Sequence, residues 1–170
     1  MVRILLLGPN RWPKDTKDPE AGLKLRRRIV TDHADLDATW IIMEDELARG
    51  DPTDKFVALA TDPSTTHVFL LWPRDARMVG TQDELILWQS IATLTGTAPE
   101  CYLFHQTGVL HIETKGVDKQ VVIDDEQGQS PYLYDILARG VFEQEWVDQN
   151  DLFVQIREVL VAHLGVQPKQ

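Results

Sequence analysis

The chain of 170 residues has a single cysteine, Cys101, which excludes an intramolecular disulfide and a zinc site built from several cysteines. Cys101 opens the apolar run 101–104, so we interpret it as a small core residue rather than a reactive thiol. Long apolar runs are missing too, since none approaches the roughly 18 residues that span a bilayer. The N-terminal stretch also lacks the small-residue cleavage site of a signal peptide. The sequence therefore predicts a cytoplasmic protein with no membrane partner.

Positive charge is also scarce. The chain carries 17 lysines and arginines against 27 aspartates and glutamates, which gives a formal net charge of −10. A protein that binds nucleic acid through a basic face needs the opposite balance, so nucleic acid is not expected as a partner. The one basic cluster, Arg26-Arg27-Arg28, falls inside a predicted helix, and we interpret it as the solvated face of that helix.

Three sequence motifs that indicate a nucleotide-binding site or a serine nucleophile are absent. There is no Walker motif, no Gly-x-Gly-x-x-Gly and no Gly-x-Ser-x-Gly. We expect no cofactor. The acidic runs 44–46 and 124–126 contain residue types that bind divalent cations, but such runs are more typical of solvated loops, and we expect no metal site.

The five histidines have no ligand partner at helical spacing. We interpret the three on predicted strands as core or sheet-face residues, and the two near predicted helix C-termini as favoured there by the helix dipole. The strand histidines are His67, His105 and His111, and the helix-end histidines are His33 and His163.

Apolar runs of strand length alternate with helical patterns through the first hundred residues. The expected strands cover 2–7, 39–43, 67–72 and 100–105, and the expected helices cover 18–33, 51–59 and 81–94. This alternation favours a three-layer α/β fold with helices on both faces of a mostly parallel, flavodoxin-like or Rossmann-like sheet.

The alternation of predicted strands and helices ends after the first hundred residues. Two β-rich runs within residues 109–124 predict an added β-hairpin, and helices are expected to begin near Ser130-Pro131 and Asn150-Asp151. We predict one α/β domain over residues 1–166 and a frayed tail over residues 167–170.

In an open parallel sheet, ligands bind beyond the carboxyl ends of the strands, where the winding direction changes. In a flavodoxin-like order that place lies between the first and third strands. One loop that emerges there contains Gly8, Pro9, Asn10, Arg11 and Trp12. The other loop, residues 73–80, leads into the N-terminus of a helix, where unpaired amides favour an anion.

Glu84, in the opening Gly80-Thr81-x-x-Glu84-Leu85 of that helix, has two interpretations. In the first, Thr81 is the N-cap and Glu84 completes a capping box, a common device at helix starts. In the second, the carboxylate projects into the ligand crevice and acts as a nucleophile or base. The two differ in where the side chain points.

The stretch from Val68 to Trp88 resembles the nucleoside 2-deoxyribosyltransferase family. The similarity lies in an apolar strand, a loop bearing Asp75, and the Glu84-Leu85 pair that opens the next helix. The same Gly80-Thr81-x-x-Glu84-Leu85 motif, with Trp88 one turn later, resembles the cytokinin-activating phosphoribohydrolases, often labelled lysine decarboxylase-like. Both resemblances imply cleavage of an N-glycosidic bond, and the first implies a flavodoxin-like fold with a glutamate nucleophile.

The resemblances imply roles for several residues. Glu84 would attack the anomeric carbon, and Asp75 would bind a sugar hydroxyl or protonate the leaving base. Gly8 and Pro9 would contact the ligand, and Asp62 would be a further sugar-binding acid. Related enzymes often complete their sites with a neighbouring subunit, so a homodimer is compatible with the resemblance.

The remaining candidates follow from the chemistry of such a ligand. A phosphate would be bound by Arg11, Arg74 or Arg77, and a base would stack on Trp12 or Trp72. Two other functions stay open: a non-catalytic, TIR-like nucleotide-binding module, and an interaction protein in which Glu84 is only a cap.

Overall fold

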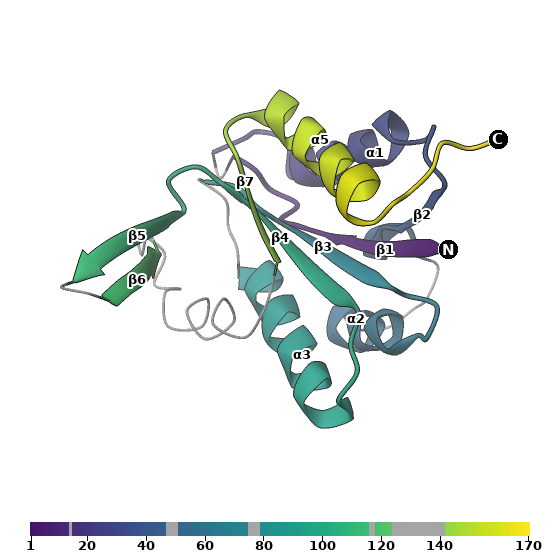
Figure 1. Ribbon diagram of the computed structural model, residues 1–170, viewed down its shortest axis with the longest axis horizontal. Coiled ribbons are helices and arrows are strands. Elements are labelled where there is room, and N and C mark those ends of the chain that lie inside the picture. The colour runs from purple at the N-terminus through teal and green to yellow at the C-terminus, as the bar shows by residue number, and fades with distance from the viewer. Residues whose placement is uncertain (14, 47–50, 75–78, 116–117, 124–141) are drawn as a thin grey trace.

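The computed structural model describes residues 1–13, 15–46, 51–74, 79–115, 118–123 and 142–170. Five strands form the main sheet: β1 (Val2–Leu7), β2 (Ala38–Ile41), β3 (His67–Trp72), β4 (Glu100–Gln106) and β7 (Phe142–Trp146). All are parallel and lie in the order β2-β1-β3-β4-β7 (Figure 1). This is the flavodoxin-like doubly wound order, and it confirms the predicted α/β class.

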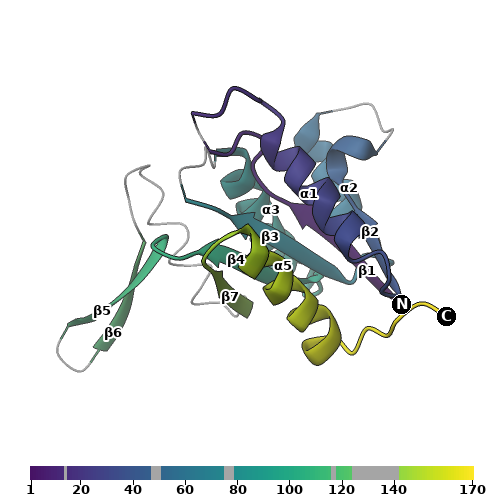
Figure 2. The ribbon, with the colours of Figure 1, turned by 90° about the horizontal axis from the view of Figure 1, so that it is seen from above.

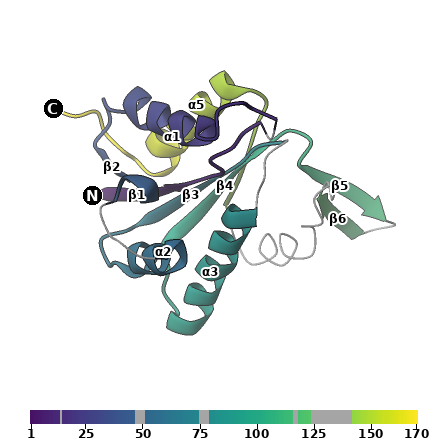
Figure 3. The same ribbon diagram turned by 180° about the vertical axis from the view of Figure 1, so that it is seen from behind.

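Helices cover both faces of the sheet, which gives the predicted three layers (Figures 1 and 3). One face carries α1 (Ala21–Asp32) and α5 (Gln149–Glu158), and the other carries α2 (Pro52–Thr61) and α3 (Val79–Thr95). Two short elements complete the set, the 3-10 turn η1 (Met43–Asp45) and the π-helical turn η2 (Val159–His163). Within the described ranges, no helix is both long and apolar enough to cross a bilayer.

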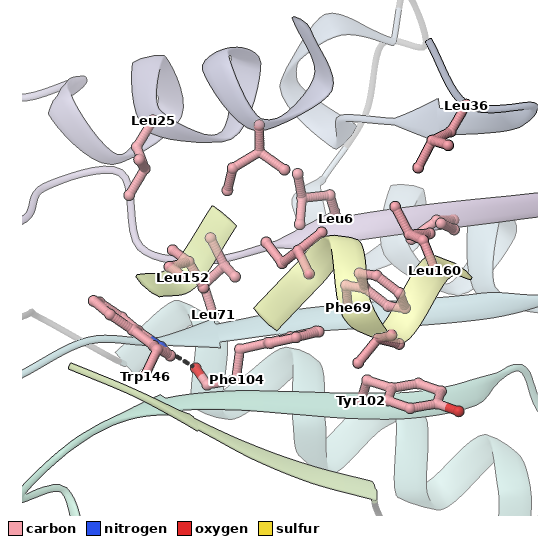
Figure 4. Close-up of a cluster of buried hydrophobic side chains, with 14 of the residues drawn as sticks. Leu6, Leu25, Leu36, Phe69, Leu71, Tyr102, Phe104, Trp146, Leu152 and Leu160 are labelled. Carbon is pink, nitrogen blue, oxygen red and sulfur yellow. Dashed lines mark hydrogen bonds between the residues drawn. The ribbon is translucent and has the colours of Figure 1, made fainter. Parts of the chain in front are cut away.

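Two cores form because successive side chains of a buried strand point to opposite faces. In β3, Val68, Leu70 and Trp72 belong to the core under α2 and α3. Phe69 and Leu71 belong to the core under α1 and α5, which Figure 4 shows. A near-continuous apolar run therefore serves both faces, which is why the bounds of β3 were predicted exactly from the sequence.

Cys101 belongs to the core under α2 and α3 and is 2% exposed. Burial raises the pKa of its thiol to about 12, so the thiolate that would react is suppressed. The prediction that this residue is part of the core is confirmed.

Strand β7 was not predicted, because its sequence is mostly polar. It lies at the edge of the sheet, where Phe142 is 51% exposed and only Trp146 is fully buried. The indole Nε1 of Trp146 donates a hydrogen bond to the Phe104 carbonyl at 3.0 Å, which anchors the strand end in the core (Figure 4).

Of the two helix starts predicted before β3, one is confirmed and the other is corrected. Asp51 caps α2 as expected, since its carboxylate accepts a bond from the Thr53 amide at 2.8 Å. Asp18 does not begin α1, which starts at Ala21. Asp18 instead accepts bonds from the Glu20 amide and the Lys24 ammonium group.

The predicted hairpin is confirmed. It consists of β5 (Leu110–Lys115) and β6 (Asp118–Ile123), which pair antiparallel as a separate two-stranded sheet away from the main one (Figure 2). The helix expected from Ser130 and the acidic run 124–126 lie outside the described residues.

The prediction of a frayed tail was wrong. The Asp37 amide donates to the Gln167 carbonyl, and the Lys169 amide donates to the Asp35 carbonyl, each at 2.8 Å. A β-bridge joins Leu36 and Pro168 between them. Backbone hydrogen bonds, which side-chain polarity does not reveal, hold the tail against the segment that leads into β2.

Candidate functional site

The loop after β1 is fixed against the start of α1. The Asn10 carbonyl accepts a hydrogen bond from the Gly22 amide at 2.6 Å. A Cβ atom at Gly22 would lie 1.8 Å from the Pro9 carbonyl oxygen, so only glycine permits this approach. This amide of the first turn of α1 is therefore already occupied by the chain and is not available to an anion.

Arg26 of α1 also binds this loop. It is buried, so the prediction that it belongs to the solvated face of its helix is wrong. It is 1% exposed, and its guanidinium donates to both carboxylate oxygens of Glu44 at 2.9 and 3.0 Å. It also donates to Oδ1 of Asn10 and, at 3.4 Å, to the Leu6 carbonyl. Paired acceptors offset the cost of burying a guanidinium, so Arg26 joins the carboxyl ends of β1 and β2.

The two neighbouring arginines of the cluster remain at the surface. Arg27 pairs with Asp45, and the Arg28 guanidinium lies 5.5 Å from the centre of the Phe153 ring. The acids Glu44 and Asp45 thus bind arginines and are not simply solvated, as the sequence had suggested. In the part of the chain that the structure describes, no group of three or more potential ligands is placed to hold a metal ion.

Trp12 joins the loop after β1 to the loop after β3. Its indole Nε1 donates to the Arg74 carbonyl at 2.6 Å, and its ring meets that of Trp146 edge-on at 5.9 Å. The apolar pocket between Trp12 and α1 has a volume of only about 10 Å³. The indole therefore fills the space between Pro9, Gly22 and Trp146.

Glu84 is in the second turn of α3, not at a capping position. The helix begins at Val79, so Thr81 already lies within it, and the predicted capping box with Thr81 as N-cap is wrong. Leu87, Trp88 and Ile91 follow Glu84 by three, four and seven positions, the spacings that place residues on one face of a helix, and these three side chains pack against the sheet. Glu84 therefore shares the sheet-facing side of α3; its side chain is half-buried, and its Oε2 is fully buried.

The height of Glu84 along the sheet follows from Ile91. Ile91 lines a groove with Thr65 and Thr66, just before the start of β3. Seven residues of helix rise about 10.5 Å, which matches about three residues of strand. Because α3 runs back from the carboxyl edge, Glu84 lies beside the middle of β3, about three residues short of its carboxyl end at Trp72.

A buried imidazole lies on the same face of the sheet, nearer the carboxyl edge. His105 pairs in register with Trp72 at the ends of β4 and β3, and it is 1% exposed. Its Nε2 bonds Oε1 of Glu143 at 2.7 Å, and its Nδ1 is buried with no hydrogen-bond partner. The prediction of a core histidine is confirmed, but its acidic partner on the unpredicted β7 was not foreseen.

The structure brings many of the predicted site residues to one edge. Six of them follow the ends of β1 and β3: Gly8, Pro9, Asn10, Arg11, Trp12 and Arg74. Three more lie in the first two turns of α3: Gly80, Thr81 and Glu84. Asp75 and Arg77, predicted as a catalytic acid and a phosphate ligand, lie outside the described residues.

Two predicted ligand contacts are wrong for reasons of position. Asp62 precedes β3 and bonds Ser64 and Arg3 at the amino edge, about 20 Å of strand away from the carboxyl edge. Trp72 is 4% exposed within the core under α2 and α3, so its ring offers almost no face to a base.

The groove at the amino edge does not combine with this site. It has a volume of about 390 Å³ and is lined mainly by small and hydroxyl-bearing residues. Four of its five threonine hydroxyls bond the chain, as in Thr65 to the Leu59 carbonyl and Thr95 to the Ile91 carbonyl. Most of the hydroxyl groups that line the groove are therefore already occupied.

Comparison with known proteins leaves the site to be interpreted from its own geometry. No protein-family model matches the chain, and no curated protein matches it.

Proposed function

We propose that this protein cleaves the N-glycosidic bond of a nucleoside or nucleotide, or transfers its sugar, with Glu84 as the nucleophile. The observation that carries the proposal is the position of Glu84 on the sheet-facing side of α3, in the second turn after the helix leaves the carboxyl edge. In the order β2-β1-β3-β4-β7 the winding direction changes between β1 and β3, and ligands of such folds bind beyond the strand ends there.

A carboxylate at this place suits the chemistry of the reaction. As the glycosidic bond breaks, its electron pair goes to the base nitrogen, which takes up a proton, and positive charge builds on the sugar. A Glu84 oxygen bonds the anomeric carbon and forms a sugar ester. Water, or a second base, then attacks the same carbon and frees the carboxylate, with the proton of the nucleophile released to the site.

The surroundings of Glu84 strengthen its electrostatic effect. Its buried oxygen lies on a helix face that continues into an apolar core, where charges are less screened than in water. The α3 N-terminus lies nearby at the same edge, and its dipole favours an anionic group of the ligand. Arg11 and Arg74, both exposed at this edge, are the described cations proposed to meet a phosphate.

The first experiment compares wild type with Glu84→Gln on a panel of nucleosides, nucleotides and NAD, measuring free base by chromatography. Wild type should release base from at least one compound, and Glu84→Gln should be slower by at least about a thousandfold because it lacks the nucleophile. Glu100→Gln is the matched control: Glu100 is exposed at the amino edge and should retain full activity.

The alternative is a non-catalytic, TIR-like nucleotide-binding or interaction module. Binding of a panel compound with no base released, in wild type and Glu84→Gln alike, would favour that alternative. Equal release of base by the two proteins would remove Glu84 from the mechanism.

A further inference from the structure

The contacts of Asn10 define which end of its side chain faces outward. The guanidinium of Arg26 donates to the Asn10 carboxamide and has no acceptor atom of its own, so the carboxamide must turn its oxygen toward Arg26. The Asn10 backbone is fixed at the same time by the Gly22 amide. The NH2 group is therefore the exposed end of a side chain whose other end is bound to a buried cation.

Arg26 is a reliable anchor because it is itself fixed. Its bidentate pair with Glu44 sets the plane of the guanidinium, and Gly8 lies against its stem, since a Cβ there would be 3.5 Å from Arg26 Cδ. Asn10 therefore presents two N–H donors at the carboxyl end of β1 with little freedom to rotate, and such preorganised donors bind with a smaller loss of entropy.

The charge of the group that holds Asn10 is neutralised, which favours an uncharged acceptor at this side chain. The positive charge of Arg26 is neutralised by Glu44, whose side chain is 26% exposed, and the neighbouring Arg27 is paired with Asp45. An anionic phosphate oxygen would gain no unpaired cation from these two pairs and is left to Arg11 and Arg74, whereas a carbonyl oxygen or ring nitrogen needs only the N–H donors.

We propose that Asn10, positioned by Arg26 and Glu44, is a specificity-determining residue that donates to an uncharged oxygen or nitrogen acceptor of the nucleoside. This inference rests on the proposed function, because it assigns one end of that ligand to the end of β1. Arg26 and Glu44 are positioning residues, since they act on the ligand only through Asn10.

The test replaces Asn10 by aspartate. Asn10→Asp retains an oxygen for Arg26 and removes both donors, so its thermal unfolding should match that of wild type. Asn150→Asp is the matched control, because Asn150 is exposed in the first turn of α5 and is not among the hydrogen-bond partners of Arg26. KM and kcat are measured for the common ribonucleosides and 2′-deoxyribonucleosides and for their 5′-monophosphates.

For the nucleoside that wild type cleaves best, Asn10→Asp should raise KM about tenfold, with kcat within about threefold, as expected for lost ground-state binding. A purely structural role would lower the unfolding temperature and kcat together and leave KM unchanged. Unchanged KM in Asn10→Asp, with wild type active, would overturn the inference while the proposed function stands.

Glu44→Gln tests the statement about charge. Removing the partner of Arg26 should improve kcat/KM for the 5′-monophosphate relative to its nucleoside by about threefold or more. A wild-type preference for the monophosphate above tenfold, lost in Asn10→Asp, would overturn the assignment of an uncharged acceptor. Absence of both binding and cleavage in wild type would overturn the proposed function and this inference together.

Discussion

At the scale of single residues, contacts between side chains that come from different loops could not be predicted from the sequence. Arg26 binds Glu44 and Asn10, which are 18 and 16 positions away in two different loops. No helical or strand periodicity relates such positions, so the basic cluster was interpreted by its composition alone. The mistake over Glu84 and Thr81 has another source, because a capping box is recognised by spacing and α3 already includes Val79 and Gly80.

Gly22 gives the sharpest stability prediction at this scale. Gly22→Ala places a Cβ where the Pro9 carbonyl oxygen lies 1.8 Å away, so the loop after β1 must move. We expect a loss of about 1–3 kcal/mol in the free energy of unfolding, as for other overpacked sites, measured by urea denaturation.

Lys24→Ala is the control for that measurement. It removes an exposed ion pair with Asp18 in the same helix and should change stability by less than about 1 kcal/mol. A stability of Gly22→Ala equal to that of wild type would show that the approach of Pro9 to α1 is not as close as described.

Asp62 carries a prediction about pH. Its pKa falls from 3.8 to about 2, first because the Ser64 hydroxyl donates to it, and then because the Ser64 amide and Arg3 do. The folded state thus binds this proton more weakly than the unfolded state, so the stabilisation is complete above about pH 4 and is lost as the pH falls toward 2.

The measurement is the unfolding temperature of wild type and Asp62→Asn between pH 2 and pH 6. Wild type should be the more stable protein near pH 6, and the difference should shrink as the pH falls through this window. A difference that stays constant with pH would contradict the proposed role of the carboxylate. Activity should be unaffected, because Asp62 is at the amino edge.

At the scale of elements, the sequence was most informative where burial leaves a continuous pattern. The five apolar residues of β1 and the apolar run of β3 predicted those strands with their exact bounds. In β7 the polar residues of an edge strand alternate with few buried ones, and that pattern resembles a loop. The missing strand also hid Glu143, and with it the partner of His105.

The C-terminal tail can be tested as an element. Deleting residues 167–170 removes two backbone hydrogen bonds and the bridge to Leu36. At about 0.5–1.5 kcal/mol for each bond, unfolding by urea should show a loss of about 1–3 kcal/mol. Deletion of residue 170 alone is the control and should have no effect. A full deletion that unfolds like wild type would restore the earlier view of a frayed tail.

At the scale of the whole molecule, the alternation of strands and helices was enough to predict the layers and the parallel sheet. The place where the winding direction changes follows from the strand order, so the edge that carries the candidate site could be predicted before any side chain was placed. Which acid faces that edge could not be predicted, because it depends on the rotation of α3 about its axis. That rotation is determined by Leu87, Trp88 and Ile91, because these three side chains pack against the sheet.

The most direct test of the central claim is to trap the sugar on Glu84. A 2′-fluorinated analogue of the best nucleoside slows breakdown of the ester, because the fluorine disfavours positive charge on the sugar. After incubation, peptide mass spectrometry should find one pentose on the peptide that contains Glu84, with none in Glu84→Gln. Release of base with Glu84 unmodified, or with the sugar bound to another residue, would contradict the account.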